Sequence, residues 1–333
     1  MNYILGVDGG NTKTDYFLFD TDANLIDYYR GGTCSHEGLK DGFEGSYRVL
    51  KAVLDDFLGR NQVEYRAVSA SAFGLAGVDT PYQKKRLEEV IKRLGFSNFR
   101  VVNDSFLGIK AGSPFGYGVC SINGTGTSSG GIDEKGDVLQ VGGIGAIVGD
   151  EAGGYHISRQ VVRAVYDEAY RFGEKTSLTP IVYSFLGVQE KAQLMEKISD
   201  SYLARKVDYT TLTIACFEEA NKKDPVAIQI LQKTAHNLAR SAGGVVVNMN
   251  FREPVPVILA GSVWVKGSCP ILVEEFKKAI ELYTKKKCDV SVLMVPPATG
   301  AVIWALEQYQ HTFPSLDIRQ KIIKQVEKRL ADS

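Results

Sequence analysis

Cysteine and histidine are scarce in this chain, and neither clusters. The 333 residues include five cysteines, odd in number and widely dispersed, with no Cys-x-x-Cys pair among them. This spacing indicates neither a disulfide framework nor a structural zinc site. The four histidines are equally isolated and form no pair at helical metal-ligand spacing. We therefore expect any metal ion to arrive with a ligand.

An excess of charge of one sign and a long hydrophobic run are also lacking. The 39 basic and 39 acidic residues balance, so no net charge draws the chain toward nucleic acid or an anionic membrane. No apolar stretch approaches the roughly 20 residues that span a bilayer. The first residues lead directly into a predicted strand, with no basic leader. We expect a cytoplasmic globular protein that takes small ligands and binds neither nucleic acid nor membrane.

The first fourteen residues contain an apolar run followed by a glycine-rich turn. Residues 3–7 predict a strand, residues 8–14 (DGGNTKT) a turn, and residues 16–19 a returning strand. Two glycines let backbone N–H groups approach an anion, and hydroxyl and ammonium side chains add donors and charge. Asp8, at the end of the strand, is placed to hold a hydrated divalent cation. The simpler interpretation of this segment is an ordinary hairpin.

A second strand, glycine turn and strand recur at residues 117–132. Before them, strands are predicted near 3–8, 14–20, 24–30, 67–74 and 99–102, and helices near 41–58 and 82–94. This is an α/β pattern with an antiparallel start. The repetition predicts a duplicated α/β unit with a boundary near residues 112–116. A nucleotide could lie between the two turns.

The remainder of the chain is predicted to be helical and then to return to strands. Residues 151–250 have apolar residues at helical spacing, most simply explained as core. A buried strand at 255–263 ends in a Gly-Ser turn, and a further strand at 290–295 leads through two prolines into a helix from residue 298. The small residues of that helix permit close packing on a neighbour.

Taken in order, these segments resemble the actin-like ATPase, sugar kinase and heat-shock superfamily. Within it they resemble the N-acetylglucosamine kinase group of the BadF/BadG/BcrA/BcrD ATPase family, over nearly the whole chain. Residues 8–14 and 124–127 are similar to its two phosphate loops, 103–105 and 298–305 to its connecting segments, and 259–263 to its adenosine segment.

The resemblance implies an α/β fold of two ribonuclease-H-like domains around an interdomain ATP and sugar cleft. The expected domains are residues 1–114 with a C-terminal helix at about 313–333, and residues 115–312 with a helical insertion at about 151–250.

The same resemblance implies ATP and Mg²⁺ as cofactors. Asp8 is then the water-mediated magnesium ligand. The expected ATP contacts are Gly9, Gly10, Asn11, Thr12 and Lys13 in the first turn, Gly124, Thr125 and Gly126 in the second, and Gly261 and Ser262 after the later strand.

Asp104 is the expected catalytic residue and also a substrate contact. Phosphorylating a hydroxyl needs a base in line with the ATP γ-phosphate, and a carboxylate at the end of a buried strand can be held there. The family has its catalytic Asp at this point. The simpler interpretation, which could coexist with catalysis, is that Asp104 only caps a helix at residues 105–110.

Sugar contacts are expected in the glycine stretch at residues 142–154 and in an earlier loop. They are Gly143, Ile144, Gly145, Asp150 and His36. A carboxylate suits this role because it accepts hydrogen bonds from several hydroxyls. Alternatively, Asp150 caps the following helix.

Two of these positions depart from the family. His36 stands where the family commonly has Asn, and it is either a sugar contact or a solvated loop residue. Ile144 replaces the Trp of the animal kinases, which can admit a bulkier sugar or one without the acetyl group.

The expected function is ATP-dependent phosphorylation of a hydroxyl, preferably the 6-hydroxyl, of N-acetylglucosamine. N-acetylmuramic acid and glucosamine are alternative substrates, and the resemblance suggests a homodimer. A different class is an ATPase activator of a dehydratase or reductase, which binds an iron–sulfur cluster between subunits. Cys120 precedes the second turn, but no matching cysteine motif accompanies it. A third class, a sugar-sensing regulator, is disfavoured by Asp104 and by the lack of a DNA-binding module.

Overall fold

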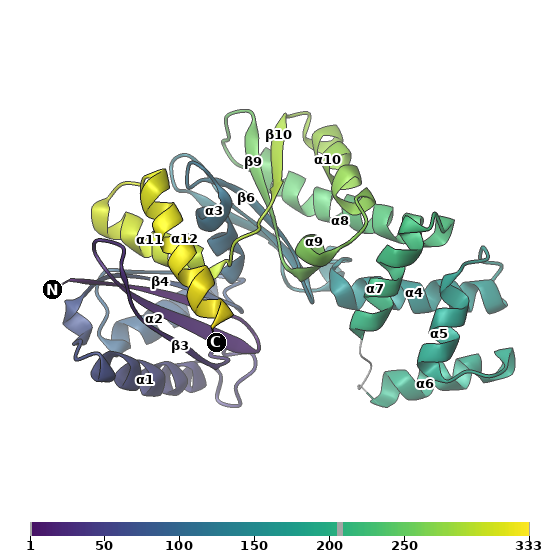
Figure 1. Ribbon diagram of the computed structural model, residues 1–333, viewed down its shortest axis with the longest axis horizontal. Helices are drawn as coiled ribbons and strands as arrows, with labels where there is room; N and C mark the ends of the chain where they lie inside the picture. The colour runs from purple at the N-terminus through teal and green to yellow at the C-terminus, as the bar shows by residue number, and fades with distance from the viewer. Residues whose placement is uncertain (1, 205–208, 333) are drawn as a thin grey trace.

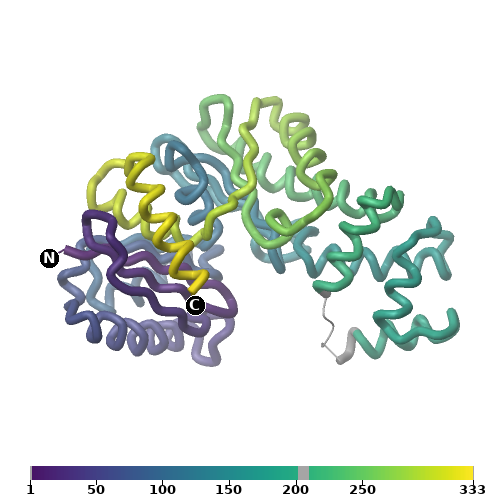
Figure 2. The backbone as a smooth tube through the Cα atoms, viewed as in Figure 1, coloured from purple at the N-terminus to yellow at the C-terminus, as the bar shows by residue number. Residues whose placement is uncertain are grey.

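The computed structural model describes residues 2–204 and 209–332 of the chain. Within these residues the strands form two five-stranded sheets, one in each of two lobes (Figure 1). A group of helices extends the second lobe away from the first. The backbone trace shows the C-terminal segment returning to lie on the first lobe, near the N-terminal strands (Figure 2).

The sheet of the first lobe has the strand order β3-β2-β1-β4-β5. Its strands are β1 (Tyr3–Gly9), β2 (Lys13–Asp20), β3 (Leu25–Gly32), β4 (Val68–Leu75) and β5 (Phe99–Val102). The first three pair antiparallel, whereas β4 and β5 continue the sheet parallel to β1. Tyr16 and Leu18 of β2 lie in one core cluster and Phe17 and Phe19 in another, because side chains alternate along a strand. Both faces of the sheet are therefore buried.

Two pairs of helices cover these faces. Helices α1 (Gly42–Arg60) and α2 (Pro81–Leu94) supply Phe57 and Ile91 to one core cluster. Helices α11 (Ala298–Gln310) and α12 (Leu316–Ala331) supply Val302 and Ile322 to the other. The first lobe is thus completed by the two C-terminal helices.

The sheet of the second lobe repeats the topology of the first. Its strands are β6 (Gly118–Asn123), β7 (Thr127–Ile132), β8 (Val138–Gly142), β9 (Val255–Ala260) and β10 (Cys288–Val292), in the order β8-β7-β6-β9-β10. Again three antiparallel strands are extended by two parallel ones. The predicted duplication is therefore confirmed. The prediction omitted β8, a partly exposed edge strand.

A mainly helical segment separates β8 from β9, in the region where the sequence predicted helices. It consists of α4 (Gly153–Tyr170), α5 (Leu178–Leu186), α6 (Leu194–Ala204), α7 (Tyr209–Asn221) and α8 (Pro225–Asn248). Helix α8 packs on the second sheet beside α10 (Ile271–Thr284), while a short helix, α9 (Ser262–Lys266), follows β9. In the part of the chain that is described, no helix is both long and apolar enough to cross a bilayer.

The two lobes share one core where α3 (Leu107–Gly112) meets α11. A Cβ atom on Gly300 would lie 2.0 Å from the Leu107 carbonyl oxygen, and one on Gly6 would lie 2.7 Å from the Val302 nitrogen. The small residues therefore let α11 lie directly against α3 and β1. Cys120 and Ile258 of the second sheet join the same core cluster.

The packing of α11 bears on the expected domain limits. We expected the second domain to run to residue 312, yet α11 packs on β1 and β4 of the first sheet. The physical reason is its glycine and alanine content, which allows close approach to the strands. We propose instead that the second domain ends before Ala298, with the first domain formed by residues 1–114 and the chain from Ala298 onward.

Candidate active site

The first glycine turn joins the antiparallel strands β1 and β2. The N–H of Gly10 donates to the Lys13 carbonyl at 2.9 Å, which closes the turn and leaves Asn11 and Thr12 exposed at its tip. Lys13 forms an ion pair with Asp15 at 3.2 Å. Gly9 is buried, and a Cβ atom there would lie 2.7 Å from the Leu75 side chain. The turn therefore presents polar groups, whereas Gly9 serves packing.

Asp8, at the carboxyl end of β1, lies in a negative environment. Burial, followed by the charges of Asp104 and Asp15, raises the pKa of Asp8 from 3.8 to about 7, against the opposing effect of Lys13. Among the described residues its carboxylate makes no hydrogen bond or ion pair, and no three His, Cys, Asp or Glu side chains converge as a metal site. The position thus has negative charge that Lys13 offsets only in part.

Asp104 follows β5, and its charge acts on Asp8 at the end of β1. The structure does not use it as the helix cap, because the Ser105 N–H donates to Asn103 Oδ1 at 2.9 Å. Asn103 is the capping residue, so the interpretation of Asp104 as a cap is wrong. Burial and the charge of Asp79 raise the pKa of Asp104 from 3.8 to about 6. A partly exposed carboxylate with a pKa of about 6 is suited to accept a proton near neutral pH.

The second glycine turn, between β6 and β7, lies against the start of α4 and the end of β9. The Gly154 N–H donates to the Gly124 carbonyl at 2.8 Å, and Thr125 and Gly126 are exposed. Gly261 has φ +109°, and a Cβ atom there would lie 2.6 Å from the Asn123 carbonyl oxygen. Only glycine combines this φ with this approach.

A cavity of about 730 Å³ opens beside this second turn. It brings together Gly124 and Thr125 with Ser262, three residues predicted to contact the nucleotide. The helical insertion and α9 complete its walls, and the other lining residues are Gly154, Tyr155, Thr210, Thr213, Ile214, Phe217, Glu218, Val263, Lys266, Gly267 and Ser268. Its volume lies in the range of small-molecule sites. Gly261 stands directly before Ser262 but does not line the cavity.

Asp150 fastens the loop that contains the predicted sugar contacts. Its Oδ2 accepts hydrogen bonds from the N–H groups of Gly143 at 2.8 Å and Gly145 at 2.7 Å. Helix α4 begins at Gly153 with no side-chain cap, so the interpretation of Asp150 as a cap is wrong. The other oxygen, Oδ1, is buried without a protein partner among the described residues. One carboxylate oxygen therefore shapes the loop, and the second is left for a further donor.

His36, in the loop after β3 of the first lobe, is held by an aromatic contact. Its ring stacks on Phe43 with centroids 4.1 Å apart and 15° between the planes. Burial lowers the pKa of His36, which favours the neutral ring at pH 7. The charge of Asp150 helps raise the pKa of Asp79, after burial as the main cause, and His36 would lower that pKa when protonated. His36 and Asp150, from different lobes, thus both influence the Asp79 carboxylate electrostatically.

Two functional candidates, Asp79 and Gln140, were missed from the sequence. Asp79 follows β4 and accepts hydrogen bonds from Asn103 and from Gln140 of β8. The available signal for Asp79 was its place just beyond the carboxyl end of a strand parallel to β1, where ligands of α/β sheets bind. Gln140 lies in the strand that was not predicted, so no signal pointed to it.

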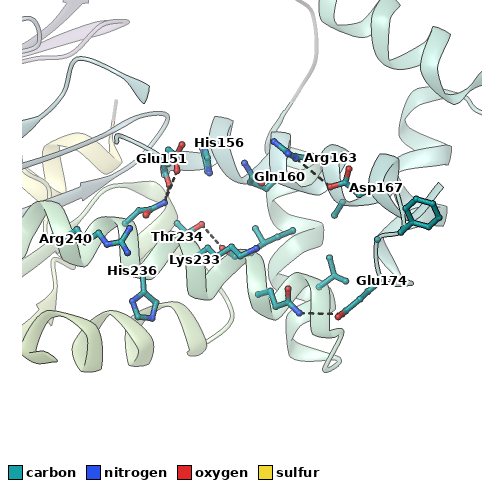
Figure 3. A pocket seen from close by; sticks show the side chains of 17 residues that line it. Glu151, His156, Gln160, Arg163, Asp167, Glu174, Lys233, Thr234, His236 and Arg240 are labelled. Carbon is teal, nitrogen blue, oxygen red and sulfur yellow. Dashed lines mark hydrogen bonds and ion pairs between the residues drawn. The ribbon is translucent and has the colours of Figure 1, made fainter. Parts of the chain in front are cut away.

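A second cavity, of about 720 Å³, lies between α4 and α8 (Figure 3). His156 and Arg163 project from α4, and Lys233 and Arg240 from α8. None of the predicted site residues lines it, although Glu151 follows Asp150 directly. This cavity is separate from the carboxylates and glycine turns described above.

Two sheets of the same topology are joined where α3 and α11 cross, and glycine turns follow the first strand of each sheet. This is the two-lobed fold of the actin-like ATPases and sugar kinases. The sequence pattern of the BadF/BadG/BcrA/BcrD ATPase family matches residues 5–305. The chain belongs to this family.

Two curated relatives match almost end to end. The N-acetylmuramic acid/N-acetylglucosamine kinase of Clostridium acetobutylicum is 30% identical over 92% of this chain and 98% of its own length. The N-acetyl-D-glucosamine kinase of Dictyostelium discoideum is 26% identical over 91% and 97%. Among solved structures, a candidate N-acetylglucosamine kinase of Chromobacterium violaceum superposes with a TM-score of 0.62 at 20% identity, covering 93% of this chain and 99% of that one. That last similarity supports the fold.

Proposed function

We propose that the protein is an ATP-dependent kinase that phosphorylates a hydroxyl, preferably the 6-hydroxyl, of an N-acetylated amino sugar, with N-acetylglucosamine as the first candidate. The observation that carries the proposal is Asp104, a partly exposed carboxylate at the cleft whose pKa burial and Asp79 raise to about 6. Both curated relatives are named as kinases of N-acetylated amino sugars.

In this proposal Asp104 accepts the proton of the sugar hydroxyl as that hydroxyl attacks the γ-phosphate of ATP. A base with a pKa near 6 is largely ionised at pH 7 and can still bind a proton in the transition state. Asn103 keeps Asp104 at the start of its turn by capping Ser105. Closure of the lobes would exclude water from the reacting groups and limit ATP hydrolysis.

The proposed nucleotide site spans the two glycine turns. The exposed Asn11 and Thr12 would meet the phosphates from the first lobe, and Thr125 and Gly126 from the second. The cavity beside Ser262 would take the adenosine. Gly261 acts here by allowing the chain to pass Asn123 closely, which places Ser262 at the cavity wall.

Asp8 fits the proposed magnesium site. Its carboxylate has no protein partner among the described residues. Burial and then the neighbouring carboxylates raise its pKa to about 7, and a bound cation would lower it again. Mg²⁺ typically takes one or two carboxylates and completes its octahedral shell with water and phosphate oxygens. When bound, the ion would neutralise charge on the transferring phosphate.

The proposed sugar site lies between Asp104 and the loop fastened by Asp150. The Oδ1 of Asp150 has no partner among the described residues, and it would accept a hydrogen bond from a sugar hydroxyl once the loop moves to uncover it. The neutral ring of His36 would contribute one donor or acceptor from the first lobe. Ile144 is 57% exposed, so this wall of the site is small and open. N-acetylmuramic acid and glucosamine therefore remain alternative substrates.

The ATPase-activator alternative is not favoured by the position of Cys120. Its side chain is fully buried in β6, and a Cβ atom on Gly108 would lie 2.6 Å from its sulfur. A thiol packed between a strand and α3 is not placed to reach a partner subunit. A homodimer in the cytoplasm remains our expectation, and light scattering of the purified protein tests the dimer.

The deciding experiment measures ADP release with ATP and Mg²⁺ in the presence of N-acetylglucosamine, N-acetylmuramic acid, glucosamine or glucose. We expect stimulation by an N-acetylated sugar and its loss by about 10²–10⁴-fold in Asp104→Asn. Mass spectrometry of the product identifies the sugar phosphate. Sugar-independent turnover, or none with any of the sugars, would contradict the proposal.

A further inference from the structure

One oxygen of Asp79 joins the two lobes. Asp79 Oδ1 accepts a hydrogen bond from Asn103 Nδ2 of the first lobe at 3.0 Å. The same oxygen accepts one from Gln140 Nε2 of the second lobe at 2.6 Å. Because the acceptor is a carboxylate, both bonds are stronger than bonds between neutral groups.

The hydrogen bond from Asn103 connects Asp79 to the turn that contains Asp104. The Asn103 amide is buried, and it is held at both ends: its Nδ2 donates to Asp79, and its Oδ1 accepts from the Ser105 N–H at 2.9 Å. Asp104 lies in the sequence between Asn103 and Ser105, the two residues that this hydrogen bond joins. Losing the bond to Asp79 would leave the Asn103 side chain free to turn, and with it the cap that fixes the orientation of Asp104.

The hydrogen bond from Gln140 connects Asp79 to the loop that Asp150 holds in place. Gln140 Nε2 lies 3.3 Å from the Gly142 carbonyl oxygen as well as bonding to Asp79. Gly143 passes directly over the pair, since a Cβ atom there would lie 2.9 Å from Asp79 Oδ1 and 2.8 Å from Gln140 Nε2. The loop therefore packs directly against the hydrogen bond between Asp79 and Gln140.

We propose that Asp79 is a positioning residue that sets the proposed base, Asp104, and the sugar loop at Asp150 in one geometry across the cleft. The inference rests on the proposed function for its kinetic meaning, but the hydrogen-bonded link does not depend on it. A displacement of about 1 Å in a reacting group can cost about 10²-fold in rate, so the link matters for turnover.

The first experiment is a double-mutant cycle with Asp79→Ala, Gln140→Leu and the double variant. We expect each single variant to lower kcat/KM for the sugar by about 10–100-fold, with KM for ATP changed less than about twofold. The double variant should be no worse than Asp79→Ala, because Asp79→Ala already removes the bond to Gln140 together with the bond to Asn103. Asp79→Asn, which keeps an acceptor oxygen, should recover most of the loss. Losses that simply add would overturn the proposal.

A matched control removes a comparable bond outside the cleft. Gln308 donates to Asn98 on the far side of the first lobe. Gln308→Leu should leave kcat and both KM values unchanged. If it lowers kcat/KM as strongly as Gln140→Leu does, the effect is general destabilisation and the proposal is wrong.

The second experiment needs no activity. Amide hydrogen exchange of the ligand-free protein reports the Ser105 N–H and the N–H groups of Gly143 and Gly145 directly. Asp79→Ala should speed exchange at all three, whereas Gln140→Leu should speed it at the two glycines and leave Ser105 unchanged. Unchanged exchange at Ser105 in Asp79→Ala would refute the link. If the parent protein phosphorylates no sugar, the proposed function fails while this result still decides the inference.

Discussion

Replacing Asp104 with asparagine should abolish turnover and at the same time stabilise the folded protein. In the folded state Asp104 is a partly exposed carboxylate, and burial and its neighbour Asp79 raise its pKa from 3.8 to about 6. The ionised form is therefore less stable in the folded chain than in the unfolded chain. Asparagine has nearly the same shape and no charge, so it avoids this cost.

The magnitude follows from the two pKa values. Each tenfold difference in proton affinity corresponds to 1.36 kcal/mol, so the folded state loses about 3 kcal/mol at a pH well above 6. The variant also loses hydrogen bonds that the carboxylate accepts, which offsets part of this gain. We therefore expect the free energy of unfolding to rise by about 1–3 kcal/mol in Asp104→Asn. Asp104 also raises the pKa of Asp8, so its neutralisation makes ionised Asp8 less costly as well.

The sign of the pH dependence is definite. Between about pH 4 and 6 the folded state binds the Asp104 proton and the unfolded state does not, so the stability of the parent protein falls as pH rises through this window. Asp104→Asn lacks this titration. The stability gained by the variant should therefore be close to zero at pH 4 and complete above pH 6.

The assay is thermal unfolding of the parent and the variant from pH 4 to 8, without nucleotide, sugar or magnesium. We expect a higher midpoint for Asp104→Asn at pH 8, by a few degrees. Asp289→Asn, at an exposed position on edge strand β10, is the control and should show no such gain. A midpoint at or below that of the parent at pH 8, or a gain that does not change with pH, would refute the reasoning.

Three further predictions follow from the same structure. kcat/KM for the sugar should fall at acid pH with an apparent pKa near 6, because Asp104 must be ionised to act as a base; a profile that is flat down to pH 5 would contradict this role. Gly261→Ala would place a Cβ atom 2.6 Å from the Asn123 carbonyl oxygen at φ +109°, so KM for ATP should rise about tenfold or more in initial-rate assays, with KM for the sugar little changed. Gly300→Ala would place one 2.0 Å from the Leu107 carbonyl oxygen, and calorimetry should show a loss of about 1–3 kcal/mol or more; unchanged stability would show that α11 and α3 do not pack this closely.

Local sequence pattern was enough to predict most of the fold. Short apolar runs ending in glycine turns identified β1 and β6, and helical spacing identified the insertion from Gly153 to Asn248. These signals are local, because the period of a strand or a helix and the need for glycine in a tight turn are properties of neighbouring residues. The repeated order of strands then followed from the repetition of the motif.

What sequence could not supply was contact between distant residues. Gln140 meets Asp79 across 61 positions, and nothing in the neighbours of either residue requires the pairing. The choice of cap is a subtler example. Asn103 and Asp104 are both good capping residues, and only the backbone geometry after β5 decides that Asn103 caps the turn and Asp104 stays available.

The return of the C-terminal helices to the first lobe has a consequence for synthesis. The strands β1–β5 leave the ribosome first, but α11 and α12, which cover the face of their sheet that includes Phe17 and Phe19, are made last. Almost 200 residues separate the end of β5 from the start of α11. At about 5–20 residues per second this delay lasts roughly 10–40 seconds. The nascent chain therefore exposes an apolar sheet face for most of its synthesis. We expect chaperones to bind this face until α11 and α12 cover it.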